Sequence, residues 1–110
     1  MKTLNLKEFG ASKEDCVILV DMFLEESKRE GVSAVKILHG YGSHGVGGVL
    51  YLSIRRHLAD LKRKKKIKNY FGGNRWNLLD DETVNALLKD KSCFDEDLNK
   101  SNPGITIILI

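Results

Sequence analysis

The first part of the chain shows two hydrophobic patterns, one of alternation and one of helical spacing. Polar and apolar residues alternate over residues 3–6, which predicts a short strand. Apolar residues then recur every three or four positions over residues 13–30, which predicts a helix that Ser12 caps and Gly31 ends. Residues 34–38 form a short, β-branched apolar run, which predicts a buried strand.

The rest of the chain continues the alternation of strands and helices. A helix is expected over about 48–61, a strand over 67–71, a helix over 78–88 and a polar loop over 89–103. The apolar run 104–110 is the strongest strand signal, and it is expected inside the sheet because it must be covered. In the helix over 48–61, one face is apolar and several basic residues point to solvent: Leu50, Ile54, Leu58 and Leu61, and Arg55, Arg56, Lys62 and Arg63.

The order of these elements predicts an α/β layer fold with a mainly parallel or mixed sheet. The chain has 110 residues, which fits a single domain over residues 1–110. Its composition, with 42% hydrophobic and 30% charged residues, is that of a folded protein rather than a disordered one.

The net charge of +3 is distributed unevenly along the chain. Residues 55–68 contain eight basic side chains and one acidic side chain, whereas residues 77–100 contain three basic and seven acidic ones. Glycines are clustered too, since five of the ten lie between residues 40 and 48. A basic block that closely follows a glycine cluster indicates a phosphate-rich partner.

Several classes of protein are disfavoured. No stretch approaches the roughly 18 consecutive apolar residues of a membrane span, and the N-terminus lacks the apolar core of a signal peptide. Cys16 and Cys93 are too few for a disulfide framework, and with the three histidines they match no zinc spacing. We therefore expect a cytoplasmic protein with reduced cysteines and no metal or cofactor, acting as a monomer or weak dimer.

A histidine and a glycine-rich segment follow the second predicted strand. Glycine is too frequent in residues 40–48 for regular structure, and it allows backbone N–H groups to approach phosphate oxygens. His39 and His44 are expected at the carboxyl end of a strand, where imidazoles transfer protons or bind phosphate as cations. The segment matches neither a Walker loop nor GxGxxG, and a flexible turn is the alternative interpretation.

The basic block completes the predicted phosphate contact, whose partner is expected to be DNA or RNA. Tyr70, Phe71 and Trp76 lie just beyond it and are predicted to stack on unpaired bases. The alternative is a solvated helix end whose cations match the helix dipole. The predicted nucleic-acid or phosphate contacts are Gly40, Tyr41, Gly42, Gly45, Gly47, Gly48, Arg55, Arg56, Lys62, Arg63, Lys64, Lys65, Lys66 and Lys68.

Two acidic clusters are not expected to bind a metal. Residues 80–82 are expected to place negative charge at a helix N-terminus, and residues 95–97 are expected to lie in a solvated loop. A weaker hypothesis is that these acids mimic a nucleic-acid backbone and occlude the basic groove.

The strand that leads into His39-Gly40-Tyr41-Gly42 resembles the small MutS-related (Smr) domain family. The likeness includes the HGxG loop, the helix over 48–61 with its basic end, and the terminal strand 104–109. It covers nearly the whole chain except about residues 74–102, which look like an insertion.

The resemblance implies an α+β two-layer sandwich of βαβαββ order, with a four-stranded mixed sheet and a helical insertion before the last strand. This arrangement is similar to the C-terminal domain of bacterial translation initiation factor three. The resemblance also implies binding of branched nucleic acid or ribosomes and nicking endonuclease activity on DNA or RNA. By position, His39, Gly40 and Gly42 match HGxG, and Gly48 and Leu50 match the start of the second helix.

The chain departs from the family pattern at polar positions. Residues 4–8 read Leu-Asn-Leu-Lys-Glu where the family's first strand ends in Leu-Asp-Leu-His-Gly. Tyr41 stands where HGxG commonly carries Lys, and Tyr51 stands where the second helix commonly carries Arg. The catalytic candidates are therefore His39 and His44, and the predicted source of positive charge is Arg55 or Arg56.

Three functional hypotheses follow. The first is an endonuclease of weak or absent activity, in which His39 acts as general base or acid. The second is a non-catalytic nucleic-acid or ribosome-binding module that clamps phosphates with residues 62–68. The third is a protein-interaction domain that docks through the acidic residues 77–100. The residues favour a nucleic-acid function and leave cleavage open.

Overall fold

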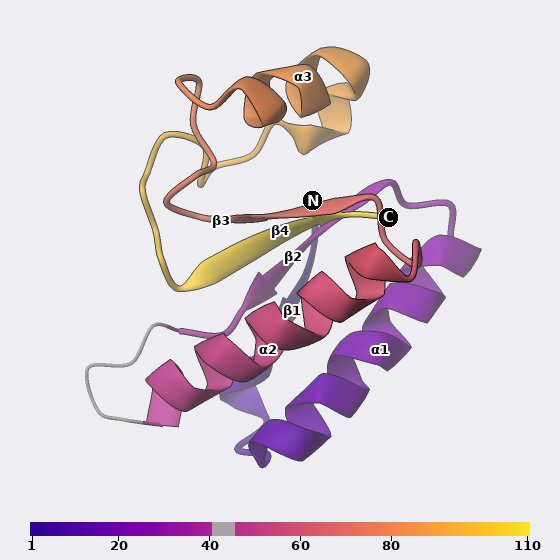
Figure 1. The fold of residues 1–110 in the computed structure, drawn as a ribbon, viewed down its shortest axis with the longest axis vertical. Helices are drawn as coiled ribbons and strands as arrows, with labels where there is room; N and C mark the ends of the chain where they lie inside the picture. Colours follow the sequence, from indigo (N-terminus) through magenta and orange to yellow (C-terminus); the bar gives the residue numbers. More distant parts are fainter. Residues whose placement is uncertain (41–45) are drawn as a thin grey trace.

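The computed structural model describes residues 1–40 and 46–110, and for residues 46–49 it describes the backbone alone. Each strand and helix expected from the sequence is present, with ends that differ by a few residues (Figure 1). The elements are β1 (Lys2–Asn5), η1 (Leu6–Glu8), α1 (Lys13–Arg29), β2 (Ala34–Leu38), α2 (Val46–Arg63), β3 (Asn69–Gly72), α3 (Asp81–Lys89), η2 (Lys91–Cys93) and β4 (Ile105–Leu109).

The four strands form one mixed sheet in the order β1-β2-β4-β3. Strands β1 and β2 are parallel, and β4 runs antiparallel to both of its neighbours, β2 and β3. The prediction that the terminal apolar strand lies inside the sheet is confirmed. In this topology β1, β2 and β3 all end at the same edge of the sheet, where β4 begins.

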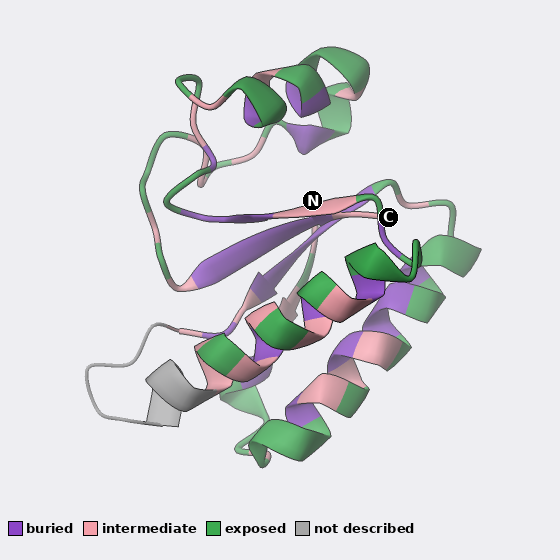
Figure 2. Ribbon diagram, in the orientation of Figure 1, coloured by how far each residue is buried: buried purple, intermediate pink, exposed green. Residues whose placement is uncertain are grey.

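Helices α1 and α2 cover one face of the sheet and bury an apolar core there (Figures 1 and 2). The Ser12 hydroxyl accepts a hydrogen bond from the Asp15 amide at 3.2 Å and so caps the start of α1, as predicted. Gly31 follows the end of α1 with a φ of +76°, the left-handed conformation that glycine adopts most easily. This core contains Val20, Phe23, Leu24, Val35, Ile37, Ile54, Leu58 and Ile108, among others.

Residues 74–102, with α3, lie on the opposite face of the sheet (Figure 1). A second apolar core forms under this 74–102 segment, in which the rings of Phe71 and Trp76 lie 5.2 Å apart. Both of these rings are completely buried, so the prediction that they stack on unpaired bases is wrong. Tyr70 points to the other face and packs, partly buried, against the core of α1 and α2.

A buried lysine attaches the 74–102 segment to the sheet. Lys36 lies in β2 and is only 4% exposed, and its Nζ atom forms ion pairs with the carboxylates of Asp95 and Asp97. The prediction that residues 95–97 form a solvated acidic loop is therefore wrong. These acids neutralise a lysine that projects from the sheet, and burial of that lysine requires such partners.

The first acidic cluster has the predicted role. Asp80 is the N-cap of α3 and accepts a hydrogen bond from the Thr83 amide at 3.0 Å. In the parts of the chain that the structure describes, no three His, Cys, Asp or Glu side chains gather as a metal site. A search of the same residues for a helix long and apolar enough to cross a bilayer finds none.

Candidate functional site

The edge where β1, β2 and β3 end brings together side chains that are distant in the sequence. Asn5 at the end of β1 is level with Leu38, and Leu38 is level with Ile105 at the start of β4. Thr106 in β4 is level with Gly72 at the end of β3. Residues that follow or face these positions therefore meet at one edge, as predicted for His39.

His39 is buried at this edge, with both ring nitrogens hydrogen-bonded inside the protein. The ring is 1% exposed, Nδ1 lies 2.6 Å from the Gly40 carbonyl oxygen, and Nε2 lies 2.8 Å from the Thr106 hydroxyl. A carbonyl oxygen can only accept, so Nδ1 carries the proton. In the neutral ring Nε2 then accepts the hydrogen bond that the Thr106 hydroxyl donates.

The surroundings of His39 favour its neutral form. Burial is the main cause that lowers the pKa of His39, and the charges of Arg55 and Lys7 lower this pKa further. Backbone hydrogen bonds at Gly40 and Ile105 act in the opposite direction but do not outweigh burial. His39 is therefore a neutral, oriented imidazole at neutral pH.

Arg55 joins the same network from α2. Its Nε–H donates to the Thr106 hydroxyl at 3.2 Å, and its guanidinium carbon lies 4.8 Å from the centre of the Tyr51 ring. The Nη2 atom of Arg55 is buried without a hydrogen-bond partner, and no carboxylate within the described residues forms an ion pair with this guanidinium. The helical spacing predicts that Arg55 points to solvent, but in the structure its side chain lies against the end of the sheet at Thr106.

A glycine at the end of β3 makes room for this guanidinium. A Cβ atom added to Gly72 would lie 2.2 Å from Arg55 Nη2 and 2.8 Å from Asn74 Oδ1. No side chain other than hydrogen therefore fits at this position while Arg55 keeps its place. The Asn74 amide and the Arg55 guanidinium border the same small space.

Lys7 adds a second cation on the β1 side of the edge. Gly40 has a φ of +73°, and a Cβ atom at this position would contact the Lys7 side chain at 3.4 Å. Lys7 forms no ion pair with any residue that the structure describes. The edge thus carries two cations, Lys7 and Arg55, whose charge no described carboxylate compensates.

The predicted basic block lies at the end of α2 and in the residues that follow this helix. Arg55 and Lys64 are nine residues apart, which corresponds to about 13 Å along a helix. In the basic segment, defined as residues 62–68, Lys62 donates to the Asn69 side chain at 2.9 Å, and Arg63 and Lys64 pair with Asp60. The remaining lysines are exposed without a carboxylate partner: Lys65, Lys66 and Lys68.

The other predicted site residues divide into two groups. Arg56 is exposed on α2, and Gly47 and Gly48 lie in the first turn of α2, where the backbone alone is described. Four predicted residues lie outside the described residues: Tyr41, Gly42, His44 and Gly45. The prediction missed Lys7, Gly72, Asn74 and Thr106. Among these, only Thr106 left a signal, as a polar residue inside the apolar run 104–110.

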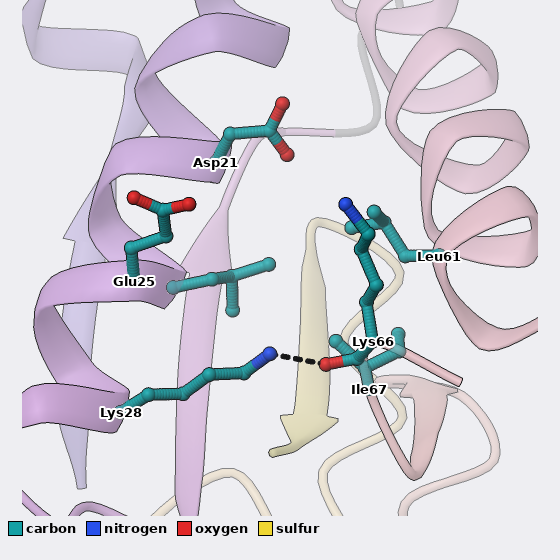
Figure 3. Close-up of a pocket in the computed structure, with 7 residues that line it drawn as sticks. Asp21, Glu25, Lys28, Leu61, Lys66 and Ile67 are labelled. Carbon is teal, nitrogen blue, oxygen red and sulfur yellow. Dashed lines mark hydrogen bonds between the residues drawn. The ribbon is translucent and has the colours of Figure 1, made fainter. Parts of the chain in front are cut away.

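A separate cleft between α1 and the end of α2 does not have the chemistry of a phosphate site. It has a volume of about 150 Å³, and Asp21 and Glu25 line it together with Lys28 and Lys66 (Figure 3). Lys28 Nζ donates to the Lys66 carbonyl and so joins α1 to the segment that follows α2 (Figure 3). The two carboxylates repel an anion, and the edge with Arg55 remains the candidate site.

Comparison with known proteins agrees with this architecture. The family model for the Smr domain matches residues 4–75. A structure search matched the crystal structure of the Smr domain of Thermus thermophilus MutS2 with a TM-score of 0.60 and 21% sequence identity, covering 99% of this chain and 96% of that chain. A search of curated proteins found no match. The family match spans β1 to the end of β3 and includes His39 and Arg55.

Proposed function

Because the chain belongs to the Smr domain family, we propose that it binds nucleic acid through the phosphate backbone, with Arg55 as the central phosphate ligand. Arg55 carries this proposal because its guanidinium is oriented before any ligand arrives. Thr106 holds Nε, the Tyr51 ring lies beside the guanidinium, and Nη2 has no hydrogen-bond partner. An Arg in this state gains a strong, charge-assisted hydrogen bond when a phosphate oxygen binds.

The arrangement of cations supports a polymer rather than a single phosphate. Lys7 lies at the same edge as Arg55, and the basic segment continues the positive charge about 13 Å along α2. Phosphates repeat every few ångströms along a nucleic-acid strand, so one polymer contacts Arg55 and the basic segment at the same time. A single small anion is too short to do so. Lys7 and the lysines of the basic segment are all exposed and add salt-dependent affinity without base specificity.

The geometry of His39 favours binding over cleavage. General acid or base chemistry needs a ring nitrogen that contacts the substrate or a water molecule. Both nitrogens of His39 are occupied by Gly40 and Thr106. We therefore assign His39 as a positioning residue, which orients the Thr106 hydroxyl and, through it, Arg55.

The experiment measures retention and cleavage of labelled single-stranded, duplex and branched DNA and RNA over a range of salt concentrations. Arg55→Gln is expected to lower affinity about tenfold or more, since a hydrogen bond to a charged group contributes roughly 1.5–3 kcal/mol. Arg56→Gln is the matched control, because it removes the same charge from an exposed neighbour on α2.

Each outcome discriminates between hypotheses. Equal losses in the two variants would show that overall charge, not the Arg55 site, binds the polymer. No retention of any substrate at low salt would overturn the proposed function. Cleavage that disappears in His39→Asn while retention persists would show that His39 is a catalytic residue rather than a positioning residue.

A further inference from the structure

A cleft of about 310 Å³ lies between α3 and the adjacent part of the sheet. Its volume is at the lower end of the range for sites that bind small ligands. The cleft is on the face that the 74–102 segment covers, whereas the Arg55 guanidinium approaches from α2 on the other face. It is therefore separate from the candidate phosphate site.

The cleft combines an apolar floor with a polar rim. Its accessible apolar surface comes from the half-buried Leu109, because Phe71 is completely buried and Ala86 is only 7% exposed. Lys68 and Lys89 are exposed lining residues, and neither forms an ion pair or hydrogen bond with any described side chain. One carboxylate, that of Glu82, also lines the cleft and accepts a hydrogen bond from Asn69. The Asn85 amide is also exposed and has no partner among the described residues.

Asn69 connects this cleft to the basic segment. Its Oδ1 accepts a hydrogen bond from Lys62 Nζ at 2.9 Å, and its Nδ2 donates to Glu82 Oε2 at 2.7 Å. Lys62 comes from the end of α2 and Glu82 from the first turn of α3, so Asn69 joins the two sides of the edge strand β3. The basic segment therefore borders the cleft, whose lining includes Lys68, the last residue of this segment.

We propose that this cleft receives one unpaired nucleotide of the nucleic acid that the protein binds, and this inference rests on the proposed function. A nucleotide matches the lining in three respects. Its flat base packs against the half-buried Leu109, its polar edge reaches the free amide of Asn85, and its phosphate lies near Lys68 and Lys89. An inorganic phosphate would leave the apolar surface of Leu109 uncovered, and a paired base could not enter.

The first test compares a single-stranded oligonucleotide with its duplex, using two charge-matched variants. Asn85→Ala combined with Lys89→Glu changes the cleft, and Lys91→Glu introduces the same charge change at an exposed position outside its lining. The cleft variant is expected to bind the single strand about tenfold more weakly than wild type, relative to its affinity for the duplex. Thermal unfolding of each variant checks that the fold is kept.

A second measurement reads the cleft directly. In amide-detected NMR, AMP is expected to shift the Asn85 side chain and the Ala86 backbone, and inorganic phosphate at the same concentration is expected to shift them less. Equal losses for single strand and duplex, or equal losses in the cleft and Lys91→Glu variants, would overturn the nucleotide site and leave the proposed function standing. If the wild-type protein retains neither the duplex nor the single strand, the proposed function itself is overturned. Shifts with AMP but none with the single strand would overturn the polymer as the source of the nucleotide.

Discussion

Lys36 and Arg55 are two cations held against opposite faces of the same sheet, and they differ in what neutralises them. Lys36 is 4% exposed and pairs with two carboxylates, those of Asp95 and Asp97. Arg55 is half-buried and donates Nε–H to a hydroxyl, and its Nη2 atom is buried without a partner. Burial alone would lower the pKa of Lys36, but hydrogen bonds and charges of the two acids raise it above the ordinary value.

This difference separates a structural cation from a ligand-binding one. Removing charges from water is costly, and a buried lysine with two close carboxylates has its cost offset inside the protein. The guanidinium of Arg55 has part of its hydration removed without a carboxylate in return. A phosphate that supplies the missing negative charge therefore gains more at Arg55 than at any cation that is already paired.

The largest expected effect comes from removing the structural cation. Lys36→Met leaves Asp95 and Asp97 close together and largely buried, with side-chain exposures of 6% and 19%. The free energy of unfolding should fall by about 3–5 kcal/mol, as for other buried pairs that lose one partner. Urea denaturation measures this change.

Two comparisons make this prediction specific. Lys13→Met removes an exposed lysine at the start of α1 and should change stability by less than about 0.5 kcal/mol. Adding Asp95→Asn and Asp97→Asn to Lys36→Met removes the unpaired charges and should recover part of the loss. A Lys36→Met protein as stable as the Lys13→Met protein would refute the structural role of the ion pairs.

The hydroxyl shared by His39 and Arg55 should have the next largest effect. Thr106→Val keeps the shape of the side chain but leaves His39 Nε2 and Arg55 Nε without their partner. We expect a loss of about 1–3 kcal/mol in stability, together with weaker nucleic-acid binding. Thr106→Ser keeps the hydroxyl and should keep binding near the wild-type level. If Val and Ser bind equally well, the hydroxyl does not position Arg55.

The sequence predicted local structure well because local structure depends on neighbouring residues. The spacing of apolar residues in α1 and the Ser12 cap are both set within a few residues, and both were predicted. The inner position of β4 was also predictable, since an apolar strand of this kind must be covered on both sides. The family resemblance, carried by the HGxG residues, is confirmed by the Smr domain match.

The interactions that define the site were not predictable because they join distant parts of the chain. His39 and Thr106 are 67 residues apart, and Lys36 and Asp97 are 61 residues apart. Helical spacing placed Arg55 off the apolar face of α2, but it could not show that the end of β3 lies there with a glycine. Lys36, a charged residue inside the apolar run 34–38, was the signal of a buried ion pair. Its partners Asp95 and Asp97 were not recognised because residues 95–97 were interpreted as a solvated loop.

The buried His39 should make stability depend on pH in a narrow range. Its ordinary pKa is 6.5, and burial lowers the pKa in the folded protein. Below about pH 6.5 the unfolded chain gains a proton at His39 that the folded protein does not bind, so stability falls as pH decreases towards the folded pKa. The expected slope reaches at most about 1.4 kcal/mol per pH unit.

Comparison with His39→Asn isolates this contribution. Urea denaturation at pH 5 and pH 7 should give a larger difference for wild type than for His39→Asn. The carboxylates of Asp60, Asp80 and Asp90 have lowered pKa values, and their effect falls mainly below about pH 5 and is the same in both proteins. Identical pH dependence in the two proteins would show that His39 is not held in its neutral form.

The smallest expected effect tests how Arg55 is held in place. Gly72→Ala introduces a Cβ atom 2.2 Å from Arg55 Nη2, so the guanidinium must move, at little cost because it is the end of a flexible side chain. The affinity for nucleic acid should fall by about tenfold or less, because Arg55 stays near the site but loses its orientation. In Arg55→Gln the guanidinium is absent, and adding Gly72→Ala should then cause no further loss of affinity. If the losses of affinity in Gly72→Ala and Arg55→Gln add fully in the double variant, Gly72 affects binding without involving Arg55. The glycine at the end of β3 would then not serve to orient the Arg55 guanidinium.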